Sequence, residues 1–356
     1  MAKQNKELID VLTNAIIKER KLYNSYNLGV MELPVKNRKA MFTTLSLNSA
    51  SKLVVLAGKA GKPKARVLDD AVDALYQKES QEMKDSGTVI TIATNKGGAG
   101  KTTSTAAIGD ILARRGNHVL LIDADPQGNL SKRFGYMPNG SSENYIGNLI
   151  NDRMDKDCEH KDISYYINHS AEHPNIDIMI SDLRLDGVYG YMNGQGALGT
   201  MVIKKIVSEV KQLGTYQYIL VDTRPSLNNE VAAVLIATDY VMIPVEPTED
   251  AIIGADSTIS FAASCREINP KLRTLGVFMT KVYDRNKSFR EAAPVIQNSW
   301  ADSVFKTLIP RSQDADNAGN EGKPVTTMFA NKKLAKKYEQ LVEEAVQRIA
   351  EFEKEA

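Results

Sequence analysis

At positions 95–103 the chain carries the stretch Asn95-Lys96-Gly97-Gly98-Ala99-Gly100-Lys101-Thr102-Thr103. An apolar run at 88–93 precedes it, and a segment with helical spacing follows it to Arg115. Glycines let the backbone turn so that successive N–H groups point inward at phosphate oxygens, and a helix N-terminus adds partial positive charge. A strand, a glycine turn and a helix in this order predict a phosphate-binding loop.

The side chains of this loop indicate which atoms a nucleotide would meet. Lys101 supplies a positive charge for the outer phosphates, and the Thr102 hydroxyl is a ligand type suited to Mg²⁺. The generic loop has glycine where this chain has Asn95, and Lys96 adds a second lysine before the glycine pair. The candidate nucleotide contacts are Lys96, Gly97, Gly98, Ala99, Gly100, Lys101, Thr102 and Thr103.

Working outward from the loop, apolar strand-like segments recur with helical segments between most of them. They lie at 88–93, 118–122, 176–180, 218–221, 240–245 and 274–279. Strands rich in Val, Ile and Leu that alternate with helices indicate a parallel sheet buried on both faces. We therefore predict an α/β fold, a P-loop NTPase with a mostly parallel sheet covered by helices on both faces, ending in a long helix from Lys332.

Several motifs together resemble the ParA/MinD family of ATPases. Lys-Gly-Gly-Ala-Gly-Lys-Thr-Thr at 96–103 looks like the deviant Walker A motif of that family. The segment 120–131 contains Asp123-Ala124-Asp125-Pro126-Gln127-Gly128-Asn129, which resembles the switch of the ParA branch. A strand ending in Asp222 resembles the Walker B motif, and 241–247 is a fourth match. The resemblance covers residues 88–350 in the family's order.

The resemblance implies a role for each matching residue. Lys101 corresponds to the phosphate-binding lysine, and Lys96 to the signature lysine that reaches across a dimer to the partner's nucleotide. Asp125 matches the carboxylate that orients the attacking water. Asp123 and Asp222 match residues that support Mg²⁺. The implied ligands are thus ATP and Mg²⁺, and the implied catalytic residues are Lys96, Lys101 and Asp125.

Two further points concern the base pocket and one departure from the family pattern. The resemblance implies that the base is held near Thr280 and the backbone around Pro310, and it implies ATP rather than GTP. Arg224 stands where the family usually has a small residue or proline. We assign Arg224 no role.

The first 87 residues lie outside the resemblance and differ in charge. They hold 15 Lys/Arg and 10 Asp/Glu, and positions 33–68 contain no acidic residue. A basic block before a mildly acidic body favours a module that faces a polyanion, although a solvated basic face gives the same pattern. We predict an N-terminal helix at 1–25, a small, mainly helical DNA-binding module at 26–80, a linker at 81–87 and an ATPase domain at 88–356.

The N-terminal module has three interpretations. A strand at 42–47 followed by helices at 49–58 and 64–78 resembles a ribbon-helix-helix. In that case Thr44 and Ser46 would face base edges. Lysines and an arginine would flank phosphates, namely Lys62, Lys64 and Arg66. Residues 49–78 are also compatible with a helix-turn-helix, and the N-terminal helix is compatible with simple dimerisation.

A second set of candidate DNA contacts follows the strand at 274–279. It consists of Lys281, Arg285, Lys287 and Arg290. In the ParA family, dimers bind DNA without sequence preference through basic residues of the ATPase domain, and these residues lie in a similar position. Such contacts would be salt-sensitive. The alternative is a set of solvated loop charges.

We therefore expect a ParA-type ATPase for plasmid or chromosome partition. It would form an ATP-dependent homodimer, bind DNA, hydrolyse ATP slowly until a centromere-binding partition protein stimulates it, and repress its own operator through the N-terminal module. The start of the chain lacks an apolar leader, so we expect a cytoplasmic protein associated with the nucleoid.

Three alternatives remain at this point. A MinD-like ATPase that cycles on a membrane would need a basic amphipathic C-terminal helix, whereas this chain ends in Glu351-Phe352-Glu353-Lys354-Glu355-Ala356. A nitrogenase-like reductase would need paired cluster cysteines, and Cys158 and Cys265 are far apart. A nucleotide-regulated DNA-binding repressor would need no intact catalytic residues, but Lys101 and Asp125 are present.

Overall fold

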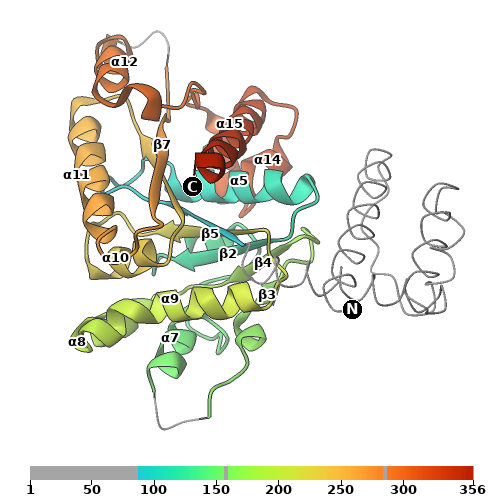
Figure 1. Ribbon diagram of the computed structural model, residues 1–356. Helices are drawn as coiled ribbons and strands as arrows, with labels where there is room; N and C mark the ends of the chain where they lie inside the picture. The colour runs from blue at the N-terminus through green and yellow to red at the C-terminus, as the bar shows by residue number, and fades with distance from the viewer. Residues whose placement is uncertain (1–86, 156–158, 284–286, 356) are drawn as a thin grey trace, which may run out of the picture. The chain divides into compact units, whose positions relative to one another are not determined.

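The computed structural model describes residues 87–155, 159–283 and 287–355 (Figure 1). In these ranges the chain forms one seven-stranded sheet with the order β3-β4-β2-β5-β1-β6-β7. The short β3 runs antiparallel to β4, and every other neighbouring pair is parallel. The strands are β1 (Thr88–Ile92), β2 (Val119–Ala124), β3 (Asn168–His169), β4 (Ile176–Met179), β5 (Tyr218–Thr223), β6 (Tyr240–Val245) and β7 (Arg273–Met279).

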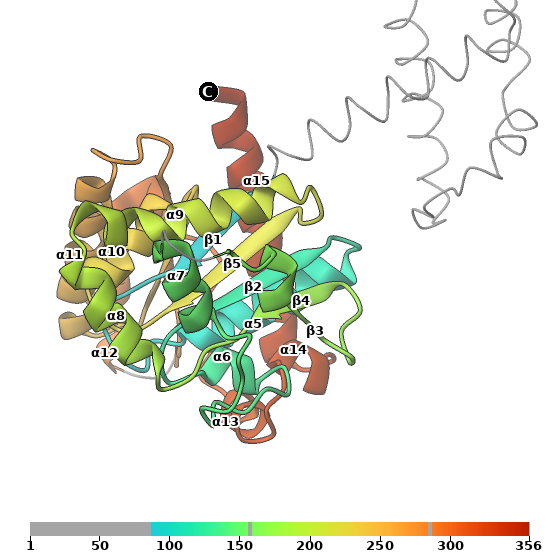
Figure 2. The same cartoon turned by 90° about the horizontal axis from the view of Figure 1, so that it is seen from below.

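Helices cover both faces of the sheet, as the two views show (Figures 1 and 2). The helices α5, α14 and α15 pack together on one face, and α7, α9 and α10 lie on the other. The bounds are α5 (Lys101–Arg114), α6 (Asn129–Lys132), α7 (Ile146–Met154), α8 (Leu185–Gly194), α9 (Ala197–Gln212), α10 (Asn229–Ile236), α11 (Glu249–Cys265), α12 (Lys287–Trp300), α13 (Gln313–Asn320), α14 (Val325–Met328) and α15 (Lys333–Glu355). Two short 3₁₀ turns, Ile163–Tyr166 and Ala301–Ser303, complete the described elements.

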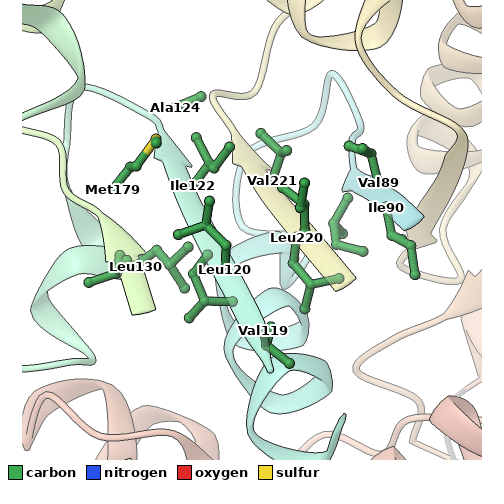
Figure 3. Packing of buried hydrophobic residues seen from close by; sticks show 14 of the residues in the cluster. Val89, Ile90, Val119, Leu120, Ile122, Ala124, Leu130, Met179, Leu220 and Val221 are labelled. Atoms are coloured by element: carbon green, nitrogen blue, oxygen red, sulfur yellow. The ribbon is translucent and has the colours of Figure 1, made fainter. Parts of the chain in front are cut away.

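The core lies between the sheet and these helices because the central strands are apolar on both faces. Every residue of β2 and of β6 is buried. Leu220 and Ile90 pair in register on β5 and β1, and Leu120 of β2 points to the opposite face of the sheet; all three are at most 2% exposed (Figure 3). Helix α5 lies close on the sheet, since a Cβ on Gly109 would come within 2.8 Å of the Leu121 side chain.

The parallel strands bring their carboxyl ends to one edge of the sheet. β1 lies between β5 and β6, while the chain leaves it through α5 to reach β2 on the far side of β5. Ligands of open α/β sheets bind where the strand order reverses in this way. The loop after β1 therefore opens at the edge where β2, β5, β6 and β7 also end.

The predicted α/β architecture is confirmed for the described residues. All six expected strands are present, and the long C-terminal helix is α15, whose buried side includes Leu334, Tyr338 and Leu341. The two-residue β3 was not expected. The predicted helix at 1–25, module at 26–80 and nearly all of the linker at 81–87 lie outside the described residues, so these domain bounds stay predictions. Within the described ranges, no helix has both the length and the apolar content that crossing a bilayer requires.

Candidate nucleotide-binding site

The loop between β1 and α5 has the backbone that a phosphate cradle requires. Gly98 and Gly100 have φ angles of 75° and 89°, in the left-handed region that glycine adopts without steric cost. A Cβ on Gly97 would meet no atom within 4 Å, so that side of the loop is open. Gly100 is also the residue before the first turn of α5, whose N-terminal N–H groups carry partial positive charge.

Lys101 begins α5 and is buried, with 6% of its surface exposed. Its Nζ donates a hydrogen bond to the carbonyl oxygen of Lys96 at 3.3 Å, across the loop. Burial lowers the pKa of Lys101, while the negative charges of Asp222 and Asp125 oppose that change. The ammonium therefore lies inside the loop, in the place from which it would contact phosphate oxygens.

Thr102 and Asp222 form the part of the site that fits a magnesium ion. The Thr102 Oγ1 donates to Asp222 Oδ2 at 2.6 Å. The other oxygen of Asp222, Oδ1, is buried and has no hydrogen-bond partner among the described residues. Burial, and next the charge of Asp123, raise the pKa of Asp222 to about 8. Because a buried carboxylate oxygen without a partner is costly, this arrangement fits a bound cation or its water.

The same arrangement limits how many protein ligands such a cation would have. In the part of the chain that the structure describes, no three His, Cys, Asp or Glu side chains gather around a common point. Mg²⁺ is commonly held by one or two protein groups, substrate phosphates and water. Thr102 and Asp222 are the residues that would hold it here.

Asp123 lies beside Asp222 but organises a loop. Its Oδ2 accepts hydrogen bonds from the Ser131 N–H at 2.8 Å and from the Ser131 hydroxyl at 2.7 Å. Its Oδ1 accepts from the Asp125 N–H at 3.3 Å. Burial raises the pKa of Asp123 to about 6, against the opposing effect of Ser131. The carboxylate thus holds residues 124–131 against the end of β2.

Asp125 sits in that loop, 8% exposed. Its Oδ1 accepts from the Gln127 N–H at 3.0 Å, and its carbonyl oxygen accepts from the Gly128 N–H at 2.9 Å. The loop is therefore folded back on itself, with the Asp125 carboxylate close enough to Lys101 to act on the pKa of that lysine.

Ser131 is a residue of this site that the sequence analysis did not identify. The sequence feature that could have indicated it is its position at the end of the segment 120–131.

Lys96 lies half-buried on the rim of the loop. Its Nζ donates to the Thr248 Oγ1 at 3.1 Å, and Thr248 is the residue before α11. In a single subunit, Lys96 is therefore held by its own chain. Nothing in the sequence marked Thr248 as its partner, because 152 positions separate the two residues.

Thr280 and Pro310, the expected base pocket, are brought together beside the loop. The segment around Pro310 pairs with the chain after β7, with the Ile309 N–H donating to the Met279 carbonyl oxygen at 2.9 Å. Thr280 is 2% exposed, and its hydroxyl donates to the Ala99 carbonyl oxygen at 2.9 Å. Thr280 therefore positions the phosphate loop, and its contact with a base stays a prediction.

The basic residues predicted to contact DNA divide into two groups. Lys287 and Arg290 lie exposed at the start of α12, where Lys287 Nζ is 3.5 Å from Glu291 Oε1. Lys281 instead extends toward the phosphate loop, where its Nζ would lie 3.8 Å from a Cβ on Gly98. The remaining candidates lie outside the described residues, namely Thr44, Ser46, Lys62, Lys64, Arg66 and Arg285.

Arg224, the departure from the family pattern, has a structural partner. Its Nη1 donates to Asp186 Oδ1 at 2.9 Å, in the first turn of α8. This ion pair links the segment after β5 to α8.

Comparison with known proteins agrees with this geometry. A family model described as an AAA domain matches residues 87–274. The chromosome partitioning protein ParA of Caulobacter vibrioides is 33% identical over 239 residues, which are 67% of this chain and 85% of that protein.

Two solved structures share the fold. A putative plasmid partition protein from Borrelia burgdorferi bound to AMPPNP has a TM-score of 0.60 and 24% identity, over 74% of this chain and 100% of the other. Cobyrinic acid a,c-diamide synthase from Mycobacterium smegmatis, with bound ADP and magnesium, has a TM-score of 0.60 and 22% identity, over 72% and 93%. From its matched domain and its identity to ParA, the chain belongs to the ParA/MinD family of P-loop ATPases.

Proposed function

We propose that this ATPase partitions plasmid or chromosomal DNA, and that ATP joins two copies of it in a sandwich dimer. One observation carries the proposal: the phosphate loop bears two lysines in different environments. Lys101 is buried inside the loop, whereas Lys96 lies on its rim, where the Thr248 hydroxyl is the one partner of its ammonium among the described residues. A rim lysine held by one neutral group is available to a second subunit's triphosphate.

The positions of the site residues support the roles that we propose for them. Lys101 and the loop N–H groups bind the phosphates, and a magnesium ion, held by Thr102 and by Asp222 through water, would neutralise phosphate charge. Asp125 orients the attacking water and accepts its proton. Lys96 of the second subunit lends a positive charge to the transition state, as an arginine finger does. Hydrolysis is slow until both subunits and a partner protein complete the site.

We assign DNA binding without sequence preference to exposed basic residues of the ATPase domain. Lys287 and Arg290 are exposed on α12 and offer charges to phosphates without reading bases. The N-terminal module binds the operator for autoregulation, and a centromere-binding partition protein stimulates hydrolysis and releases the dimer. The ATPase works in the cytoplasm, on the nucleoid. The relatives named ParA and plasmid partition protein support this assignment.

The test is binding of the full chain to operator DNA and to random DNA without nucleotide, with ADP, and with a non-hydrolysable ATP analogue. The protein should bind random DNA only when the analogue is present. Under the same condition, sedimentation should show that the mass of the protein doubles from one chain to two. Binding to DNA should weaken steeply as the salt concentration rises. Equal binding in all three nucleotide states, or an analogue-bound monomer, contradicts the proposal. Deletion of residues 1–85 should spare ATPase activity and remove the operator footprint. Anionic vesicles in place of DNA test the membrane-cycling alternative.

A further inference from the structure

Lys281 has a backbone conformation that lysine rarely adopts. Its φ is 52°, and among the described residues only one other non-glycine residue, Ala301, has a positive φ. The conformation is held from both sides: the Thr280 N–H donates to the Val245 carbonyl oxygen at 2.8 Å, and the Val282 N–H donates to the Ile309 carbonyl oxygen at 3.0 Å. Strained backbone that the surrounding structure enforces is concentrated at functional sites.

The effect of this turn is to bring the Lys281 ammonium to the phosphate loop. A Cβ on Gly98 would have the Lys281 Nζ as its nearest neighbour, at 3.8 Å. The preceding residue, Thr280, is itself bonded to the loop through the Ala99 carbonyl oxygen at 2.9 Å. The end of β7 thus fixes the loop with one residue and places a positive charge beside it with the next.

The present partner of Lys281 is weak enough to be exchanged. Its Nζ lies 4.0 Å from Glu246 Oε2, and the two side chains are 42% and 29% exposed. An ion pair at this distance and exposure contributes little to stability, since water screens it. A phosphate oxygen offers a shorter, charge-assisted hydrogen bond to the same ammonium.

We propose that Lys281 binds the phosphate chain of the nucleotide held in its own subunit, leaving Glu246 when the nucleotide enters. This assignment rests on the proposed nucleotide site. Lys281 would then be a third lysine at the phosphate loop, in addition to the buried Lys101 and the rim residue Lys96. This role differs from that of the exposed DNA candidates on α12. Three lysines favour the more highly charged ATP over ADP.

The test compares Lys281→Met with Lys336→Met in the full chain by calorimetric titration with ATP and with ADP. Lys336 is the control, because it is an exposed lysine on α15 that belongs to neither the nucleotide site nor the proposed DNA contacts. Lys281→Met should weaken ATP binding about tenfold, as expected for one charge-assisted hydrogen bond, and ADP binding less. Lys281→Arg should recover part of the loss, and Lys336→Met should leave both affinities unchanged.

A second variant separates phosphate binding from a purely structural role. Glycine accepts a φ of 52° freely, so Lys281→Gly should leave the melting temperature without nucleotide no lower than that of the parent protein, while the increase on adding ATP becomes smaller. An unchanged increase with ATP overturns the proposal. So does a Lys281→Met protein that keeps its ATP affinity but loses binding to random DNA, since Lys281 would then face DNA.

The variant Lys101→Ala tests the nucleotide site itself, independently of Lys281. If Lys101→Ala abolishes ATP binding and Lys281→Met leaves it unchanged, the site stands and the role of Lys281 is wrong. If Lys101→Ala binds ATP normally, the proposed site fails, and the inference about Lys281 fails with it.

Discussion

Asp123 and Asp222 lie opposite each other on adjacent parallel strands, paired in register at the ends of β2 and β5, and both are fully buried. Their hydrogen bonding differs. Both oxygens of Asp123 accept hydrogen bonds from the loop at 125–131, whereas Oδ1 of Asp222 has no partner among the described residues. One carboxylate therefore shapes the switch loop, and the other leaves an oxygen for a cation or its water.

Asp222→Asn should weaken ATP binding about 10- to 100-fold when Mg²⁺ is present, because residues that support a metal through water or through another ligand typically contribute that much to metal affinity. Binding in EDTA should change little. Calorimetric titration in both conditions measures the difference. Asp177→Asn is the control, since Asp177 lies near the opposite end of the sheet and pairs with the Tyr216 hydroxyl. An equal loss with and without Mg²⁺ would show that Asp222 acts on the fold rather than on the metal.

Lys101→Ala should abolish measurable nucleotide binding, because it removes the only ammonium buried within the described part of the loop. Titration with a fluorescent ATP analogue measures it. Lys336→Ala, an exposed substitution on α15, should bind the analogue as the parent protein does. Unchanged affinity in Lys101→Ala would refute the loop assignment.

Asp125→Ala should lower ATP turnover at least about 100-fold, since a positioned general base contributes that order of rate, and should accumulate an ATP-bound dimer. Turnover and light scattering on a sizing column measure the two effects. Asp125→Asn separates chemistry from structure: the amide oxygen still accepts from the Gln127 N–H but cannot take a proton from water. Normal turnover in Asp125→Asn removes the proposed role.

Ser131→Ala should reduce the free energy of unfolding by about 1–3 kcal/mol, because it leaves buried polar groups without their partner. The Ser131 hydroxyl donates to Asp123 Oδ2 at 2.7 Å and accepts from the Ser181 N–H at 3.0 Å. Urea denaturation measures the change. Ser264→Ala, at an exposed position on α11, should stay within about 0.5 kcal/mol of the parent. Equal effects of the two substitutions would contradict the buried network.

Asp110→Asn should change how stability depends on pH. Although burial raises the pKa of Asp110, hydrogen bonds from His173 and Thr326 and the charge of Arg114 outweigh it, so the pKa is below its ordinary value of 3.8. A carboxylate with a lowered folded-state pKa stabilises the fold above its unfolded pKa, and that contribution is lost as pH falls through the folded pKa. Denaturation from pH 7 to 3 should show a lower starting stability and a flatter acid decline for Asp110→Asn. Parallel curves for the two proteins would contradict this.

Local patterns in the sequence predicted much of the architecture. The glycine-rich stretch at 95–103 and the Val/Ile/Leu runs are contiguous, so spacing alone predicted the phosphate loop, the strands and the parallel sheet. Roles for Asp125 and Asp222 came from the resemblance to ParA/MinD ATPases, because a single aspartate at a strand end has no distinctive local signal. Arg224 was noticed as a departure, but its ion pair with Asp186 could not be inferred.

Contacts between distant positions were decided by the three-dimensional arrangement. The Thr280 hydroxyl meets the Ala99 carbonyl oxygen across 181 positions, and Lys96 meets Thr248 across 152. Charge placed Lys281 among DNA candidates, whereas its left-handed backbone turns its ammonium toward Gly98. The reason is physical: hydrophobic periodicity specifies which residues are buried in a strand or helix, but strand order and register specify which side chains meet at the edge of the sheet.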